Sequence, residues 1–150
     1  MEKKIILLVE DNPDDELLTL RSLNNSNVIN KIVVTRDGAE ALDYLFNRGE
    51  YASREAALLP ELVLLDLKLP KVDGLDVLRE IRQDRRTRLL PVVVLTSSDE
   101  EQDLVESYKL GANSYVRKPV DFDQFAQAVR QLQLYWMVLN QAPPNEGSNR

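Results

Sequence analysis

Acidic and basic side chains follow the apolar stretches of this 150-residue chain at several separate places. Glu10 and Asp11 end the run IILLV, Asp66 ends LVLL, and Lys118 follows SYVR. Converging carboxylates repel one another unless a cation lies among them, and oxygen ligands with remaining water positions suit Mg²⁺. A carboxylate beside such an ion, with an ammonium and a hydroxyl nearby, can attack phosphorus and hold the acyl phosphate that forms. We therefore predict that Asp66 is a nucleophile at a magnesium site.

The composition excludes several other chemistries. Cysteine and histidine are both absent, which removes thiolate nucleophiles, disulfides, the usual zinc sites and any Ser-His-Asp arrangement. The net charge of −6 argues against a general nucleic-acid surface. A local basic run is interpreted as the solvated end of a helix, and it comprises Arg82, Arg85, Arg86 and Arg88. No nucleic-acid partner is predicted.

The N-terminal apolar run is too short to be a signal peptide or a membrane span, because Glu10 and Asp11 interrupt it. We therefore expect a cytoplasmic protein with no membrane partner.

Five apolar segments with strand character alternate with five helical segments. The strands are expected at 4–9, 32–35, 62–66, 92–96 and 114–117. The helices are expected at 13–24, in a short stretch with Ala41, Leu42 and Leu45 after the turn and cap Asp37-Gly38, at about 75–83, at 98–111 and at 121 to about 140. Such alternation is typical of an α/β fold, in which a doubly wound five-stranded parallel sheet is flanked by helices on both faces. One domain over 1–141 is expected, followed by a disordered tail at 142–150.

Three local patterns mark helix starts. Asn12 precedes Pro13 at the first predicted helix, Ser98 and Glu101 form a capping box, and Asp121 caps the last helix.

The carboxyl ends of parallel strands meet at one edge of a sheet, which is where such folds bind ligands. Each polar residue there has an ordinary explanation alone, as a helix cap or a surface charge. Together they predict a site, comprising Glu10, Asp11, Asp66, Thr96, Ser97 and Lys118.

The chain resembles the receiver domain of two-component response regulators over roughly 4–139. The resemblance rests on Glu10-Asp11, the stretch DLKLPKVDG at 66–74, Thr96, and Lys118-Pro119, in this order and strand context. It implies a flavodoxin-like sheet with strand order 2-1-3-4-5, and a histidine kinase that transfers phosphate to Asp66.

The same resemblance implies roles for the other residues. Asp11 and Asp66 would bind Mg²⁺ directly, Glu10 mainly through water, and Lys68 through its backbone carbonyl. The phosphoryl oxygens would be held by Thr96, Ser97 and Lys118. Thr96 would move toward the phosphate and Tyr115, which packs on the fourth helix at rest, would turn inward.

More narrowly, the long segment 47–60 and the aromatic end of the last helix are similar to small stand-alone regulators paired with bacterial and cyanobacterial phytochromes. The last helix, about 27 Å long over 122–139, would overhang strands of about 17 Å. Its apolar end, which its own domain cannot cover, predicts a partner surface with Tyr135, Trp136 and Leu139. The family resemblance implies that this surface forms a homodimer through helix four, strand five and helix five. Alternatively, segment 47–60 covers that end.

Two other functions are known for related α/β folds, and the sequence argues against both. A magnesium-dependent phosphatase or phosphotransferase with an aspartyl-phosphate intermediate usually needs a second acid two residues after the nucleophile, where this chain has Lys68. A flavin or nucleotide module would need a glycine-rich loop after the first strand, and that loop is missing.

Overall fold

A five-stranded parallel sheet forms the centre of the protein. The computed structural model describes residues 4–54 and 58–144. The strands lie in the order β2-β1-β3-β4-β5, with bounds β1 Ile5–Val9, β2 Lys31–Thr35, β3 Leu62–Leu65, β4 Val92–Thr96 and β5 Ser114–Arg117. The predicted α/β fold and strand order are confirmed. Asp66 lies one residue beyond β3, and its N–H donates to the carbonyl of Val9 at 3.1 Å.

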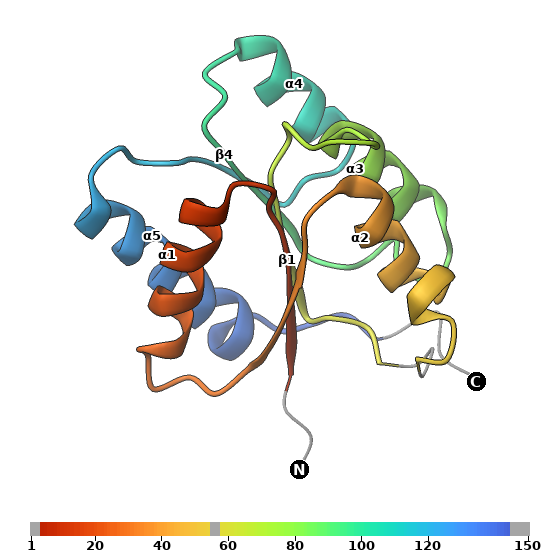
Figure 1. Cartoon of the computed structure of the whole chain (residues 1–150), viewed down its shortest axis with the longest axis horizontal. Helices are drawn as coiled ribbons and strands as arrows, with labels where there is room; N and C mark the ends of the chain where they lie inside the picture. The colour runs from red at the N-terminus through yellow and green to blue at the C-terminus, as the bar shows by residue number, and fades with distance from the viewer. Residues whose placement is uncertain (1–3, 55–57, 145–150) are drawn as a thin grey trace.

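Helices cover both faces of the sheet. Their bounds are α1 Pro13–Asn24, α2 Gly38–Leu45, α3 Gly74–Gln83, α4 Glu101–Lys109 and α5 Phe122–Leu134, with a 3₁₀ turn η1 at Gly49–Tyr51 and a π-helical turn η2 at Tyr135–Leu139. Figure 1 shows α1 and α5 side by side on one face, and α2 and α3 on the other. None of these helices, within the described residues, is long and apolar enough to cross a membrane.

The core is divided by the sheet into two apolar clusters. One contains Leu7, Val63 and Val94 from the strands together with residues of α2 and α3. The other contains Ile6, Leu64 and Val93 with residues of α1 and α5. Alternate residues of each central strand therefore point to opposite faces, and both faces are apolar, as expected for a buried parallel sheet.

Two of the three predicted helix starts are confirmed. The Asn12 side chain accepts from the N–H groups of Asp14 and Asp15, with Pro13 at the first helical position. Asp121 accepts from Asp123 and Gln124 in the same way. These bonds satisfy N–H groups that the first helical turn leaves free.

The predicted capping box at Ser98 and Glu101 is wrong. The helix α4 begins at Glu101, its N-cap is Glu100, and no side chain caps it. Ser98 lies two residues before the N-cap; its hydroxyl donates to the carboxylate of Asp103 at 2.6 Å and accepts from the N–H of Glu100 at 3.3 Å.

Segment 47–60 packs on the α2 face, except for residues 55–57, which lie outside the described part. The Tyr51 ring meets the Tyr44 ring edge-on at 5.2 Å, and its hydroxyl donates to Glu40 at 2.7 Å. The guanidinium of Arg54 lies 4.0 Å from the centre of the Tyr44 ring. Tyr51 and Arg54 therefore lie across the sheet from α5, and the alternative in which this segment covers the end of that helix is wrong for these residues.

The end of α5 is only partly exposed. Met137 is buried and Trp136 is half-buried against the cluster under α1 and α5, while Leu134, Tyr135, Val138 and Leu139 are exposed. The expectation that this end cannot be covered by its own domain is thus wrong for Met137. The wider turn of η2 changes which side chains face the sheet. The predicted tail overlaps the described residues only at 142–144, which have no regular secondary structure.

Candidate functional site

Side chains from several strand ends meet at the carboxyl edge of the sheet. Lys118, directly after β5, places its ammonium nitrogen 2.7 Å from a Glu10 oxygen and 3.1 Å from an Asp66 oxygen. Glu10 follows β1 and Asp66 follows β3, so three separate strands contribute. All three side chains are almost completely buried. The predicted convergence of Glu10, Asp66 and Lys118 is therefore present in the structure.

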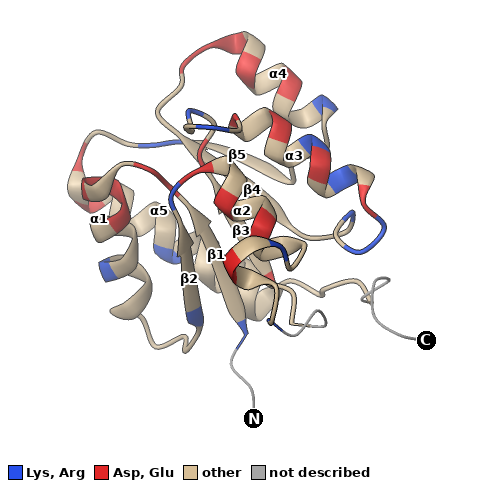
Figure 2. Ribbon diagram, turned by 45° about the vertical axis from the view of Figure 1, so that its right-hand side comes forward, with Lys and Arg blue, Asp and Glu red and all other residues tan. Residues whose placement is uncertain are grey.

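Three carboxylates at this edge have the arrangement of a cation site. One oxygen from each of Glu10, Asp11 and Asp66 lies within 4.8 Å of the others. Glu10 and Asp66 are buried and Asp11 is exposed, so the cluster opens to solvent on one side. Carboxylate oxygens with an open side suit Mg²⁺, which keeps several of its waters. The donor set fits the predicted metal, and Figure 2 shows acidic residues at this end of α1.

Burial and charge compete in this cluster. Burial raises the pKa of Glu10 to about 7, although the contact with Lys118 opposes the shift. For Lys118, burial alone would lower the pKa, but hydrogen bonds to Asp15 and Glu10 and the charge of Asp66 outweigh it and raise the pKa above its ordinary value. Lys118 therefore remains a fixed cation.

Asp15 is a member of this cluster that the sequence reasoning missed. Its carboxylate lies 2.8 Å from the Lys118 ammonium, closer than that of Asp66. In the sequence Asp15 is indistinguishable from the other first-turn acids of α1, which favour a helix N-terminus on general grounds. Its residue type and spacing therefore carry no signal that separates it from Asp14 and Glu16.

Two glycines allow the loop after β3 to pack tightly. A Cβ on Gly74 would lie 2.4 Å from the carbonyl oxygen of Asp66, and one on Gly38 would lie 1.9 Å from the carbonyl oxygen of Val72. Lys71 has a φ of 66°, a left-handed conformation that is uncommon for a residue with a side chain. The loop holds the backbone behind Asp66 in a fixed shape.

The residues after β4 form a second group, in which Ser98 makes most of the contacts. Its N–H donates to the Thr96 hydroxyl at 3.3 Å, and its carbonyl accepts from the Tyr115 hydroxyl at 3.2 Å. The Ser98 hydroxyl donates to Asp103, whose carboxylate is also 3.4 Å from the Lys68 ammonium. Thr96 is fully buried and Ser97 is exposed. Ser98 thus connects Thr96, Tyr115 and α4, a position that the capping-box interpretation missed.

Lys68 contacts Asp66 through its backbone. Its N–H lies 3.4 Å from an Asp66 oxygen, while its side chain extends toward α4. The role predicted for its carbonyl as a metal ligand stays a prediction.

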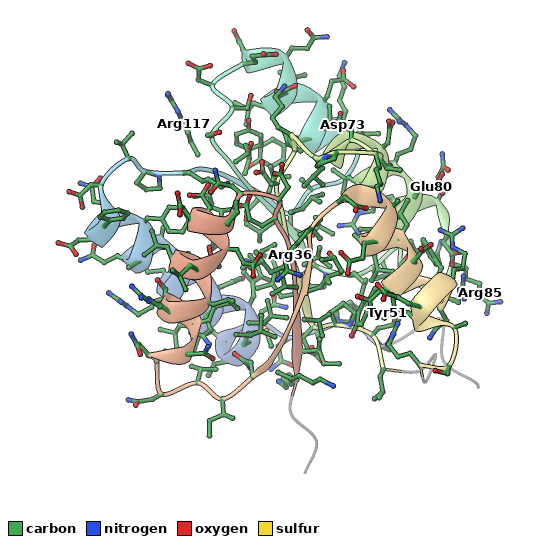
Figure 3. All side chains as sticks on the ribbon, in the orientation of Figure 1. Arg36, Tyr51, Asp73, Glu80, Arg85 and Arg117 are labelled. Atoms are coloured by element: carbon green, nitrogen blue, oxygen red, sulfur yellow. The ribbon has the colours of Figure 1, made fainter. Side chains whose placement is uncertain are left out.

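The basic run at the end of α3 is mostly exposed, in line with its interpretation as a solvated helix end. Arg85, which points away from the protein in Figure 3, is exposed, as are Arg86 and Arg88, and only Arg82 is half-buried. Arg82 donates to the carbonyls of Gly111 and Arg88, and Arg86 pairs with Asp84.

The fold and this site define a doubly wound α/β protein whose acidic and basic side chains meet at the carboxyl edge of the sheet. The chain belongs to the response regulator receiver domain family, which it matches over residues 6–130. Members of this family among its relatives are signalling regulators rather than classical enzymes, so the phosphatase alternative is not favoured.

Individual relatives are similar over almost their whole length. The chain is 43% identical to the probable methanogenesis regulatory protein FilR2 of Methanothrix harundinacea, covering 93% of this chain and 87% of that protein. It is 40% identical to response regulator Rcp1 of Synechocystis sp., covering 89% of each. The structure of Rcp1 in its Mn²⁺-bound form has a TM-score of 0.87, and covers 94% of this chain and 99% of that one at 38% identity.

A further solved structure is that of the phosphorylated cyanobacterial phytochrome response regulator RcpA. It has a TM-score of 0.89 and 42% identity, and covers 95% of this chain and all of that chain. The predicted resemblance to phytochrome-associated regulators is confirmed by these relatives.

Proposed function

We propose that this protein is a phospho-acceptor switch, in which a histidine kinase transfers a phosphoryl group to Asp66. The observation that carries the proposal is the position of the Asp66 carboxylate, which lies 3.1 Å from the Lys118 ammonium and in one cluster with oxygens of Glu10 and Asp11. A nucleophile, a fixed cation and a metal-binding donor set lie within one small site. The relatives described above, one named as phosphorylated and one as Mn²⁺-bound, support this reading.

In the transfer, an Asp66 carboxylate oxygen forms a bond to phosphorus, and the bond from phosphorus to the donor histidine nitrogen breaks. That nitrogen keeps the electron pair of the broken bond. The Lys118 ammonium offsets negative charge on the phosphoryl oxygens, with the hydroxyls of Thr96 and Ser97 as further donors. Mg²⁺, held by Glu10, Asp11, Asp66 and the carbonyl of Lys68, would neutralise part of the same charge.

The switch would act through the group around Ser98. Phosphorylation adds about −1.5 to −2 charges beside Thr96. If the Thr96 hydroxyl turns toward the phosphoryl group, it loses the N–H of Ser98, which now lies 3.3 Å away. Ser98 also accepts from Tyr115, so the change reaches β5 and α4.

For the partner we propose a phytochrome-type histidine kinase in the cytoplasm, since RcpA carries that association in its name. We further propose a single receiver domain at 1–141 that forms a homodimer. The exposed Tyr135 and Leu139, beside the half-buried Trp136, supply an apolar surface next to β5. Charged replacements at Tyr135 and Leu139 should reduce the dimer to a monomer in sedimentation.

The test is labelling with acetyl phosphate and with a phosphorylated histidine kinase, each with and without Mg²⁺. The parent should gain one phosphoryl group that is labile in acid and in alkali, and only when Mg²⁺ is present. Asp66→Asn should gain none. Asp73→Asn is the matched control, because Asp73 lies in the same loop, and it should be labelled like the parent. Labelling of Asp66→Asn, or steady release of phosphate from p-nitrophenyl phosphate by the parent, would contradict the proposal.

A further inference from the structure

We propose that Asp15 is a positioning residue for Lys118, and that it holds the ammonium beside Asp66 throughout the phosphoryl transfer. The inference rests on the proposed function and deepens it. Asp15 lies on α1, outside every sequence motif from which the site was predicted.

The Lys118 ammonium has three N–H donors and, among the described residues, three carboxylate partners. These are Glu10 at 2.7 Å, Asp15 at 2.8 Å and Asp66 at 3.1 Å. They come from three different elements, which fixes the nitrogen in three directions. The Lys118 side chain is only 5% exposed, so water has little access to replace a lost partner. Each carboxylate therefore contributes to the position of the ammonium.

Asp15 differs from Glu10 and Asp66 because it has no part in metal binding and does not react in the proposed transfer. Glu10 and Asp66 both belong to the group of oxygens that could hold a cation, whereas Asp15 does not. Asp66 also loses its carboxylate charge when it becomes an acyl phosphate. Asp15 is thus the partner whose charge is neither shared with the metal nor consumed by the reaction. It is able to keep Lys118 in place while the other two contacts change.

The backbone around Asp15 is itself firmly held. Its N–H donates to the Asn12 side chain at 3.0 Å, and its carbonyl accepts from the Thr19 hydroxyl at 2.7 Å. A short side chain on a capped helical turn loses little conformational entropy when it forms a contact. The carboxylate therefore acts from a preorganised position.

The ordinary alternative is a surface ion pair with no functional effect. The Asp15 side chain is 31% exposed, and exposed pairs contribute little. The neighbouring Asp14 provides a control for this alternative. It lies in the same helical turn, is exposed, and has no ion pair in the described structure. Asp14→Asn removes the same charge without removing the contact.

The first measurement is the free energy of unfolding in metal-free buffer. Asp15→Ala should lower it, because one donor of a buried ammonium is left unpaired. Asp15→Asn, which keeps an acceptor oxygen, should have a smaller effect, and Asp14→Asn should match the parent. A loss in Asp14→Asn equal to the loss in Asp15→Ala would show that the contact with Lys118 contributes nothing and would overturn the proposal.

The second measurement is the phosphorylation rate at saturating acetyl phosphate and saturating Mg²⁺, at a temperature where every variant is folded. Asp15→Ala should be about tenfold slower than the parent, the cost of one charge-assisted hydrogen bond in the transition state. Asp14→Asn should match the parent. In a Lys118→Met background, the additional change Asp15→Ala should have no further effect on the residual rate.

A parent-like rate for Asp15→Ala would overturn the positioning role while leaving the proposed function intact. So would an undiminished effect of Asp15→Ala in the Lys118→Met background, because the residue would then act by another route. If the parent accepts no phosphate at all, the proposed function fails. The unfolding measurements would still decide whether Asp15 stabilises Lys118.

Discussion

Two lysines flank Asp66, and they belong to regions of very different character. Lys118 lies in the cluster of Glu10, Asp15 and Asp66, where its side chain is 5% exposed and has three carboxylate partners. Lys68 lies on the loop after β3, where its side chain is 59% exposed and pairs with Asp103 at 3.4 Å. Lys118 therefore belongs to a buried charge cluster, whereas Lys68 is a solvent-exposed partner of Asp103, whose own side chain is only 12% exposed.

The different environments of Lys118 and Lys68 suit two different roles. Charges removed from water interact strongly and hold a fixed geometry, which suits the binding of a phosphoryl group. A pair with one partner in solvent is weaker and breaks at lower cost, which suits a contact that changes between two states. Because Asp103 also contacts Ser98, the Lys68 pair lies on the side of the site that connects to α4 and Tyr115.

The largest effect is expected for Lys118→Met. Without the ammonium, buried carboxylates remain uncompensated, so the free energy of unfolding in metal-free buffer should fall by about 3–5 kcal/mol. Mg²⁺ should restore part of this loss, because it supplies the missing positive charge. Lys68→Met is the matched control and should change stability by less than about 1 kcal/mol. Urea unfolding with and without Mg²⁺ measures both, and similar losses for the two variants would remove the distinction between the regions.

The pH dependence of the buried cluster should come next in size. The pKa of Glu10 is raised from 4.5 to about 7 by burial, so between these values the folded protein holds a proton that the unfolded chain has lost. The contribution of Glu10 to stability is therefore present below about pH 4.5 and is lost as the pH rises through about 7. Glu10→Gln should flatten this part of a metal-free stability curve. A parent curve that rises over the same range in parallel with Glu10→Gln would contradict the assignment.

A smaller and more selective effect is expected for Thr96→Ala. The variant should still accept phosphate, because the nucleophile and the Lys118 contacts are unchanged. The response of Tyr115 should be reduced, because the Thr96 hydroxyl accepts from the N–H of Ser98, whose carbonyl accepts from the Tyr115 hydroxyl. The fluorescence or NMR signal of Tyr115 before and after phosphorylation measures this coupling. The same Tyr115 response in Thr96→Ala and in the parent would show that the signal takes another route.

The smallest effect is expected for the Lys68 and Asp103 pair. A double-mutant cycle with Lys68→Ala and Asp103→Asn should give a coupling of about 0.2–1 kcal/mol in the unphosphorylated protein. The coupling should decrease after phosphorylation, when a new anion lies close to Lys68. A coupling that is unchanged by phosphorylation would place Lys68 outside the switch.

The fold and the centre of the site were predictable because both depend on local patterns. Short apolar runs specify buried parallel strands, and parallel strands bring their carboxyl ends to one edge. Asp66 and Lys118 follow such runs directly, so their meeting required only the sheet. Asp15 lies in α1 and not at a strand end, so its contact with Lys118 depends on the path of a long side chain.

The wrong predictions at Ser98 and Met137 rest on local sequence patterns that other contacts in the fold override. Ser98 and Glu101 have the spacing of a capping box, yet the Ser98 hydroxyl is used by Asp103 and the helix begins after Glu100. At the end of the last helix, Met137 is buried in the π-helical turn η2, although the apolar end was predicted to overhang the sheet.

The central claim is that Asp66 carries the phosphoryl group, and identification of the modified residue tests it most directly. The phosphorylated parent is reduced with borohydride, which converts an aspartyl phosphate to homoserine, and the peptides are sequenced by mass spectrometry. Homoserine at position 66, present only after incubation with Mg²⁺ and phosphodonor, is the predicted result. Homoserine at position 11 or 15 with Asp66 unchanged, or no homoserine in a fully labelled protein, would contradict the account.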